Sequence, residues 1–204
     1  MKKNPYEGKF IVFEGIDGSG KTTQFKMLSK YLKDNKKNIL VTKEPTRGRI
    51  GKIIYNILEG REKASHVFLQ LLFSADRAEH LEKEVIPALK SGRNVLCDRY
   101  LFSTLAYGNS EIGDMAWLTN LSKYFILPDI TFLIKVAPKE SIHRVKNIRK
   151  KDSTIFEKEN KLKKIWKNYE ILSKKYKNFY TIDGERDKKE VFEDIKNIIN
   201  KKTK

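Results

Sequence analysis

Glycine, lysine and threonine residues between Gly15 and Thr22 have the types and the spacing that bind phosphate. The segment reads GIDGSGKT and matches the pattern G-x-x-x-x-G-K-[ST] at every fixed position. Glycines let successive backbone N–H groups turn toward one anion, Lys21 would contact the β- and γ-phosphates, and the Thr22 hydroxyl would contact Mg²⁺. An apolar run precedes the glycines and apolar residues at helical spacing follow them, so the loop would end at a helix N-terminus. The segment therefore predicts a nucleoside triphosphate site.

Charged residues follow two further apolar runs. Asp98 and Arg99 come directly after the second of these runs. An acid at the end of such a strand is where a phosphate-loop protein holds Mg²⁺, directly or through water, and Arg99 suits a transferred phosphoryl group. Either residue could instead be a helix cap or a surface ion pair. After the first run come Glu44, Arg47 and Arg49, where a parallel strand would open toward a ligand.

Phe73 and Arg77 lie four residues apart and therefore on one side of a predicted helix. This helix runs from Ser65, a potential cap, to Gly92. Its apolar face contains Val67, Leu71, Ala75, Ala78, Leu81, Val85 and Leu89. Because Phe73 and Arg77 lie off that face, spacing alone favours a partly buried phenylalanine beside a solvated arginine.

Five apolar runs alternate with helical patterns and predict the strands that position these residues. The runs are Phe10–Phe13, Ile39–Thr42, Asn94–Cys97, Ile130–Val136 and Phe179–Ile182. Such alternation is typical of an α/β protein with a five-stranded parallel sheet and helices on both faces, which makes three layers. A single domain over residues 1–204 is expected. The basic segment around residues 147–156 is either a solvated loop or a mobile lid that closes on phosphate.

Composition favours a cytoplasmic protein that binds no membrane. No apolar run is long enough to cross a bilayer, no secretory signal is evident, and the single cysteine, Cys97, agrees with a reducing compartment. The formal net charge of +17 could attract nucleic acid. Because the lysines are spread over nearly every predicted helix, a solvated basic surface is favoured over a nucleic-acid site.

Taken in order along the chain, five motifs resemble the thymidylate kinase family of nucleoside monophosphate kinases. They are FEGIDGSGKTTQ, EPT, LLFSADR, DRYLFSTLAYG and a basic lid, and the resemblance runs from Phe10 to about Asp183. Many NTPases share the phosphate loop, but LLFSADR followed by DRY and S-T-x-x-Y is far more specific. The resemblance implies a phosphate-loop NTPase fold and the phosphorylation of dTMP to dTDP by ATP with Mg²⁺.

The same match implies roles for individual residues on the acceptor side. Phe73 would stack on the thymine ring and Arg77 would approach the base, which reverses the interpretation from spacing. Asp17 would engage the sugar 3′-hydroxyl, and Arg99 would hold the acceptor phosphate with help from Arg47 or Arg49. The residues expected to bind dTMP are Asp17, Glu44, Pro45, Arg47, Arg49, Phe73, Arg77, Arg99, Ser103, Thr104 and Tyr107.

On the donor side, the resemblance implies that the loop needs a cation from the lid. Some members carry an arginine after the aspartate of the loop, whereas Gly18 follows Asp17 here, so Arg149, Lys150 or Lys151 would supply that charge. The residues expected to bind ATP are Gly15, Ile16, Asp17, Gly18, Ser19, Gly20, Lys21, Thr22 and Thr23. The expected catalytic residues are Asp17, Lys21, Arg99 and Arg149, and Thr22 and Asp98 would hold Mg²⁺.

Two other functions compete with this interpretation. In a deoxynucleoside kinase, Glu44 would deprotonate a 5′-hydroxyl, but an uncharged acceptor would leave Arg99 and the Arg47/Arg49 pair without a phosphate. A nucleotide-binding regulator or nucleic-acid-associated ATPase is the more remote alternative, suggested only by the basic charge. We expect ATP and dTMP as partners, no specific nucleic acid, and a homodimer formed through helices beside the sheet, the last on the resemblance alone.

Overall fold

The computed structural model describes residues 1–148 and 155–202, and five parallel strands form its centre. The strands are β1 (Phe10–Glu14), β2 (Ile39–Lys43), β3 (Asn94–Asp98), β4 (Ile130–Lys135) and β5 (Phe179–Asp183). Each begins at the predicted residue and ends within one residue of the predicted end. The order across the sheet is β2-β3-β1-β4-β5, so β1 lies between β3 and β4. All five residues of β1 are buried, as expected for a parallel strand covered on both faces.

Helices and helical turns connect the strands. In chain order they are α1 (Lys21–Asp34), α2 (Arg49–Leu58), α3 (His66–His80), the π-helical turn η1 (Leu81–Val85), α4 (Ile86–Lys90), α5 (Leu101–Ser103), the π-helical turn η2 (Thr104–Gly108), α6 (Asn109–Ile112), α7 (Met115–Leu121), α8 (Pro138–Ile148), α9 (Ile155–Lys175) and α10 (Lys188–Lys202). The helix predicted from Ser65 to Gly92 is α3, η1 and α4 together. Ser65 caps it, because its side chain accepts a hydrogen bond from the Phe68 N–H at 3.1 Å.

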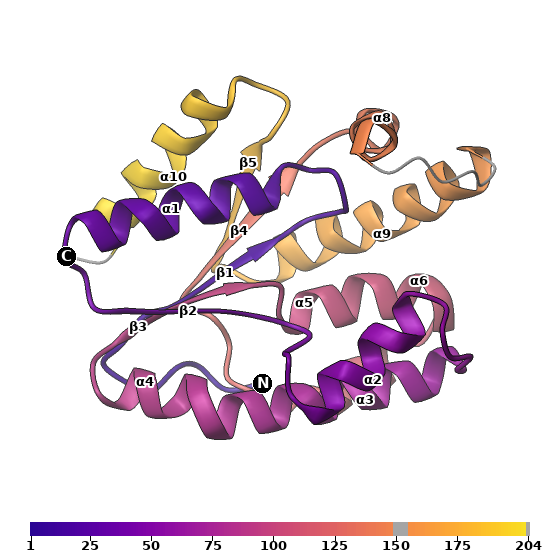
Figure 1. Ribbon diagram of the computed structural model, residues 1–204, viewed down its shortest axis with the longest axis horizontal. Coiled ribbons are helices and arrows are strands. Elements are labelled where there is room, and N and C mark those ends of the chain that lie inside the picture. The colour runs from indigo at the N-terminus through magenta and orange to yellow at the C-terminus, as the bar shows by residue number, and fades with distance from the viewer. Residues whose placement is uncertain (149–154, 203–204) are drawn as a thin grey trace.

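Two hydrophobic clusters lie on opposite faces of the sheet. One joins the sheet to α1 and α10, and the other joins it to η1, α4, the α5 to η2 segment and α9. Helices α1 and α10 lie on one side of the strands and α4 and α9 on the other (Figure 1). These layers confirm the predicted three-layer α/β fold. That the chain forms a single domain stays a prediction. Of the helices that the structure describes, none has the length and apolar character to span a membrane.

The predicted apolar face is wrong throughout α3, where Val67, Leu71, Ala75 and Ala78 are all exposed, and holds only for Leu81, Val85 and Leu89 in η1 and α4. Val67 and Leu71 are 46% and 45% exposed. The buried residues of α3 are instead Gln70, Asp76, Arg77 and His80. The reason is that α3 packs with its polar side against the segment after β2, where the Asp76 carboxylate accepts hydrogen bonds from the Thr46 N–H and hydroxyl at 2.8 and 2.6 Å.

The carboxyl ends of the central strands bring the charged residues together. Phe13 pairs with Asp98 on one side and with Phe132 on the other, so the loops that follow β1 and β3 start next to each other. The strand order also reverses at β1, since β2 and β3 lie on one side of it and β4 and β5 on the other. In open parallel sheets the crevice at such a reversal is the usual ligand site.

Candidate active site

The phosphate-binding segment forms the loop between β1 and α1. Gly20 precedes α1 with a φ of +86°, and no side chain caps this helix, which leaves its first amides available to an anion. Gly18 has a φ of +80°, and a Cβ atom there would lie 2.5 Å from the Ser141 carbonyl oxygen of α8. Position 18 therefore accommodates only glycine in this arrangement.

Lys21 and Asp98 form an ion pair at the carboxyl ends of the central strands. Lys21 Nζ lies 2.8 Å from Asp98 Oδ1, and the two side chains are 8% and 17% exposed. Burial lowers the pKa of Lys21 and the nearby Arg99 lowers it further, while Asp98 acts in the opposite direction. The structure thus places a desolvated ammonium group at the start of α1, where a phosphate would give it a second anionic partner.

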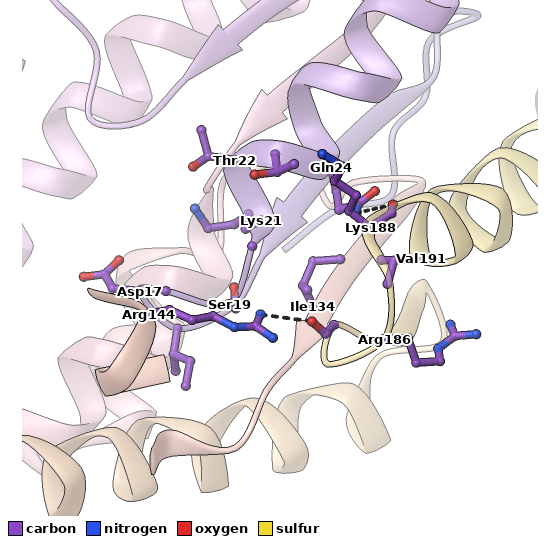
Figure 2. A pocket seen from close by; sticks show the side chains of 15 residues that line it. Asp17, Ser19, Lys21, Thr22, Gln24, Ile134, Arg144, Arg186, Lys188 and Val191 are labelled. Atoms are coloured by element: carbon purple, nitrogen blue, oxygen red, sulfur yellow. Dashed lines mark hydrogen bonds between the residues drawn. The ribbon is translucent and has the colours of Figure 1, made fainter. Parts of the chain in front are cut away.

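A cavity of about 630 Å³, here called the donor cavity, opens over the loop. Its lining contains nine residues of the loop and α1 together with residues of β4, α8, the turn after β5 and α10 (Figure 2). These are Ile16, Asp17, Gly18, Ser19, Gly20, Lys21, Thr22, Thr23, Gln24, Ile134, Arg144, Gly184, Arg186, Lys188 and Val191. All of the residues expected to bind ATP are among them except Gly15, which joins β1 to the loop.

Arg144 reaches from α8 over the donor cavity. Its Nη1 donates a hydrogen bond to the Gly184 carbonyl oxygen at 3.0 Å, as Figure 2 shows, and its Nε donates to Glu140 at 2.8 Å. With Ile134 and Val191 this gives the cavity lining a guanidinium plane and apolar surface beside the loop. Such a lining suits the flat face of a nucleobase.

A second cavity of about 350 Å³, here called the acceptor cavity, shares Asp17 with the first. It is lined by Asp17, Glu44, Pro45, Leu58, His66, Leu69, Gln70, Phe73, Arg77, Arg99, Tyr100, Ser103, Thr104, Tyr107, Glu111 and Lys161. Nine of the eleven residues expected to bind dTMP therefore lie around one cavity. They come from the loop, from the segment after β2, from α3 and from the segment after β3.

Arg99 lies where the two cavities meet. Its Nη2 donates to Asp17 Oδ1 at 2.5 Å, its Nη1 donates to the Ser103 hydroxyl at 3.0 Å, and its guanidinium carbon lies 5.1 Å from the centre of the Tyr107 ring. Burial raises the pKa of Tyr107 to about 12, although Arg99 opposes the shift. Tyr107 is therefore a neutral hydroxyl at physiological pH, and the local positive charge comes from Arg99.

Arg77 is fully buried and bound to Glu44. Its Nε and Nη2 both lie 2.8 Å from Glu44 Oε2, and Nη2 also donates to the Thr104 hydroxyl at 3.0 Å. The solvated arginine that spacing alone favoured is therefore wrong, since this side chain is only 1% exposed. Within the described part of the chain its Nη1 has no hydrogen-bond partner. A buried donor of this kind is costly unless a ligand or water satisfies it.

Glu44 is held from both sides. Its Oε2 faces Arg77 and its Oε1 lies 3.1 Å from Nδ1 of His80, whose Nε2 is 2.8 Å from the Thr42 hydroxyl. A carboxylate engaged in this way is poorly placed to remove a proton from a substrate. The arrangement does not favour Glu44 as the base of a deoxynucleoside kinase.

Several predicted residues lie elsewhere. Arg47 and Arg49 are exposed and do not line the acceptor cavity, because the hydrogen bonds between Thr46 and Asp76 turn the chain away from it after Pro45. Their role at the acceptor phosphate stays a prediction. The lid residues Arg149, Lys150 and Lys151 lie outside the described residues.

Sequence reasoning missed several residues around the cavities, of which three bear directly on the site. Glu14 ends a buried apolar strand in the same way as Asp98, so the same signal could have found it. Gln70 lies three residues before Phe73 and seven before Arg77 on the same side of α3, and it is buried. Arg144 carries no signal, because an arginine in an amphipathic helix is ordinary.

The residues near the loop fit a Mg²⁺ ion that is bound mainly by nucleotide. Thr22 offers a hydroxyl in the donor cavity, and the Asp98 carboxylate lies next to Lys21. In the described residues no cluster of three or more His, Cys, Asp or Glu side chains could hold a metal. In proteins, Mg²⁺ usually retains several waters and binds phosphate oxygens together with only one or two protein ligands.

A parallel α/β sheet with a phosphate loop at its central strand and a second cavity beside it defines a phosphate-loop nucleotide kinase. Comparison with known proteins identifies the family within that class. The thymidylate kinase family model matches residues 13–195, so the chain belongs to the thymidylate kinase family. The resemblance inferred from the motifs is confirmed.

Individual relatives agree with this assignment. The chain is 44% identical to a probable thymidylate kinase of Methanocaldococcus jannaschii, with 87% of each chain covered. It is 38% identical to a probable thymidylate kinase of Pyrococcus abyssi, with 92% of this chain and 94% of the relative covered. A probable thymidylate kinase of Pyrococcus horikoshii is 44% identical over 68% of this chain and 70% of its own length. A cytoplasmic location and the lack of nucleic-acid binding stay predictions.

Proposed function

We propose that this chain transfers the γ-phosphoryl group of ATP to dTMP, with ATP in the donor cavity and dTMP in the acceptor cavity. The observation that carries the proposal is that the two cavities meet at Asp17, with Lys21 in one lining and Arg99 in the other. Phosphoryl transfer needs two substrates aligned across a cluster of positive charge and little covalent chemistry from the protein. This geometry supplies both requirements.

In the donor cavity, the loop amides and Lys21 bind the phosphates of ATP. The part lined by Arg144, Ile134 and Val191 receives the adenine base. Thr22 and Asp98 hold Mg²⁺, the latter directly or through water. When bound, the ion neutralises charge on the β- and γ-phosphate oxygens.

In the acceptor cavity, the ring of Phe73 stacks on thymine, and Arg77 and Thr104 face the edge of the base. Arg77 and Thr104 support this, because both line the acceptor cavity and are hydrogen-bonded to each other. Tyr107 lies by the deoxyribose, Asp17 engages its 3′-hydroxyl, and Arg99 holds the phosphate. These positions follow the cavity lining residue by residue.

In the reaction, an oxygen of the dTMP phosphate forms a bond to the γ-phosphorus while the bond from that phosphorus to the bridging β,γ-oxygen breaks. The attacking oxygen is already anionic at neutral pH, so no general base is required. Lys21 and Arg99 neutralise charge on the transferred group. Arg149 in the segment around residues 147–156 supplies the remaining cation, since Gly18 provides none.

A homodimer is the assembly that we propose. Exposed apolar residues on α3 begin with an adjacent pair and then follow at three or four positions, so they form one stripe along the helix. This α3 stripe contains Val67, Phe68, Leu71, Ala75 and Ala78. Exposed apolar surface of this kind marks interfaces, and a second copy of α3 would cover it by two-fold symmetry.

A substrate panel tests the proposed reaction. Purified protein is assayed for ADP release with ATP, Mg²⁺ and, separately, dTMP, dUMP, thymidine and AMP. We expect turnover with dTMP and none with thymidine. Turnover of thymidine without turnover of dTMP would replace the proposal with a deoxynucleoside kinase. Tight oligonucleotide binding at physiological salt without any monophosphate turnover would replace it with a nucleic-acid-associated ATPase.

The Lys21→Ala variant is the matched control for this panel, because it removes one charge from the donor cavity. Loss of a preorganised charge-stabilising donor typically costs about 10²–10³ in kcat, and we expect a loss of that size with the thermal unfolding curve retained. Near-normal ADP release from the variant would contradict the role of Lys21 or reveal a contaminating kinase. A mock purification from cells that lack the expressed chain, assayed in the same way, separates these two explanations.

A further inference from the structure

Glu14 is a buried carboxylate between the two cavities, and the reaction as described so far does not use it. It is the last residue of β1, directly before the phosphate loop, and has no exposed surface. Its Oε1 accepts hydrogen bonds from the backbone N–H groups of Tyr100 and Ser103 at 3.0 and 3.1 Å. Its Oε2 accepts from the hydroxyls of Ser103 and Tyr169 at 2.6 and 2.8 Å.

The two bonds to Oε1 fix the turn that presents Arg99. Arg99 has a φ of +69°, a left-handed conformation that residues with a Cβ atom seldom adopt and that persists only where the surroundings hold it. The Arg99 N–H donates to the Phe13 carbonyl oxygen at 3.0 Å, and Tyr100 and Ser103 follow in the same turn. The end of β1 therefore holds this turn from both sides, through the Phe13 carbonyl and the Glu14 carboxylate.

The two bonds to Oε2 orient the guanidinium group through one hydroxyl. Arg99 Nη1 donates to Ser103 Oγ at 3.0 Å, and Ser103 Oγ in turn donates to Glu14 Oε2. Because the Ser103 hydroxyl donates its hydrogen bond to the carboxylate, the lone pairs of its oxygen are available to accept a hydrogen bond from Arg99. Tyr169 of α9 donates to the same Oε2 and lies 3.2 Å from the Ser103 hydroxyl, which confines both groups.

A carboxylate at this buried position costs free energy that an apolar side chain would not. Burying an ionised group costs free energy unless several donors satisfy it, and an apolar residue of the same volume often stabilises a protein more. Here four donors from three residues converge on one side chain, and the arginine that these residues hold lies where the cavities meet. These hydrogen bonds are better explained by the positioning of the Arg99 guanidinium than by packing of the hydrophobic core.

We propose that Glu14 is a positioning residue for Arg99, with its Oε1 fixing the backbone of the turn and its Oε2 fixing the guanidinium through Ser103 and Tyr169. The inference rests on the proposed role of Arg99 at the acceptor phosphate. Glu14 touches neither substrate. It acts by keeping the arginine aligned between Asp17 of the loop and the acceptor cavity.

The Glu14→Gln variant tests this with little change of shape. The glutamine oxygen can keep both backbone N–H bonds, while its NH₂ group would face the two hydroxyls and reverse the direction of the Ser103 bond. A misplacement of catalytic groups by about 1 Å can cost roughly 10²-fold in rate. We expect kcat to fall by about 10- to 100-fold, with the KM for ATP changed less than about twofold. Tyr169→Phe, which removes one donor, should show a smaller loss of the same kind.

A double-mutant cycle distinguishes positioning from ordinary stability. If Glu14 acts through Arg99, Glu14→Gln should change kcat less than about twofold when it is added to Arg99→Lys, since coupled residues are not additive. Equal factors in the two backgrounds would overturn the inference, as would an unchanged kcat in Glu14→Gln alone. Ser122→Ala, which deletes a buried hydroxyl that donates to the Leu118 carbonyl, is the control for lost stability and should leave kcat unchanged.

The outcomes also separate this inference from the proposed function. If Arg99→Lys alone lowers kcat but neither Glu14→Gln nor Tyr169→Phe does, only the role of Glu14 fails. If Arg99→Lys leaves both kcat and the KM for dTMP unchanged, the proposed role of Arg99 fails and the positioning role fails with it. Should Glu14→Gln not fold, Tyr169→Phe carries the same cycle.

Discussion

Phe73 is a half-buried aromatic side chain in the lining of the acceptor cavity, one helical turn before Arg77. If it stacks on thymine, Phe73→Ala should raise the KM for dTMP by about tenfold or more, because stacking of a base on an aromatic ring is worth about 1–3 kcal/mol. The KM for ATP should stay the same, since Phe73 does not line the donor cavity. Steady-state kinetics with each substrate varied in turn measure both values.

The matched control for this substitution is Tyr124→Ala. Tyr124 is an exposed aromatic residue outside both cavities, so its removal should leave both KM values unchanged. An unchanged KM for dTMP in Phe73→Ala would mean that the ring only packs within the protein.

The pH dependence of stability gives an independent view of Glu14. Burial raises its pKa above the ordinary value of 4.5, although hydrogen bonds from Ser103 and the charge of Arg99 oppose the shift. A folded-state pKa above the unfolded value stabilises the protein most below the unfolded pKa and loses that effect as pH rises through the folded pKa. The free energy of unfolding of the wild type minus that of Glu14→Gln should therefore be larger at about pH 4 than at pH 7.

Urea unfolding of both proteins between about pH 4 and 8 measures this difference, and groups that titrate alike in the two proteins cancel. Each tenfold change in proton affinity is worth about 1.4 kcal/mol, which urea titration resolves. A difference that grows with pH would show that the four hydrogen bonds outweigh burial and hold the pKa of Glu14 below its ordinary value.

At the scale of elements, the sheet could be predicted from the sequence because buried parallel strands are nearly unbroken apolar runs. The loop between β1 and α1 could be predicted as well, since its glycines and Lys21 stand at fixed spacing within a few residues. Both signals are local. Helix α3 shows the limit of such signals, because periodicity indicates that a helix has two faces but does not indicate which face is buried.

The side of α3 that carries Gln70 and Arg77 is buried because of partners far away in sequence. Arg77 is buried by an ion pair with Glu44, 33 residues earlier, and Glu14 is bonded to Tyr100 and Tyr169, 86 and 155 residues later. Contacts between residues so far apart in the chain cannot be predicted from local spacing in the sequence. The family resemblance pointed to Arg77 despite this, but it gave no reason for the arginine to be buried.

At the scale of the whole molecule, α1 and α10 lie on one face of the sheet and α4 and α9 on the other (Figure 1). The side chains of the α3 stripe stay exposed. Five of the seven large apolar residues that are exposed in the described part of the chain lie on α2 and α3. A basic surface with a formal charge of +17 repels a second copy, so an apolar stripe is the feature through which two copies could associate.

Phe68 lies in the α3 stripe and is 49% exposed, so Phe68→Glu tests the proposed homodimer. In a two-fold interface each substitution occurs twice, and two carboxylates placed in an apolar contact would have to lose water without gaining a partner. The molar mass from light scattering on a sizing column should therefore fall from that of two chains to that of one, at micromolar concentration. Ile171→Glu adds the same charge at an exposed apolar site on α9 and should remain dimeric. A wild-type protein with the mass of one chain, or dissociation of both variants alike, would contradict association through α3.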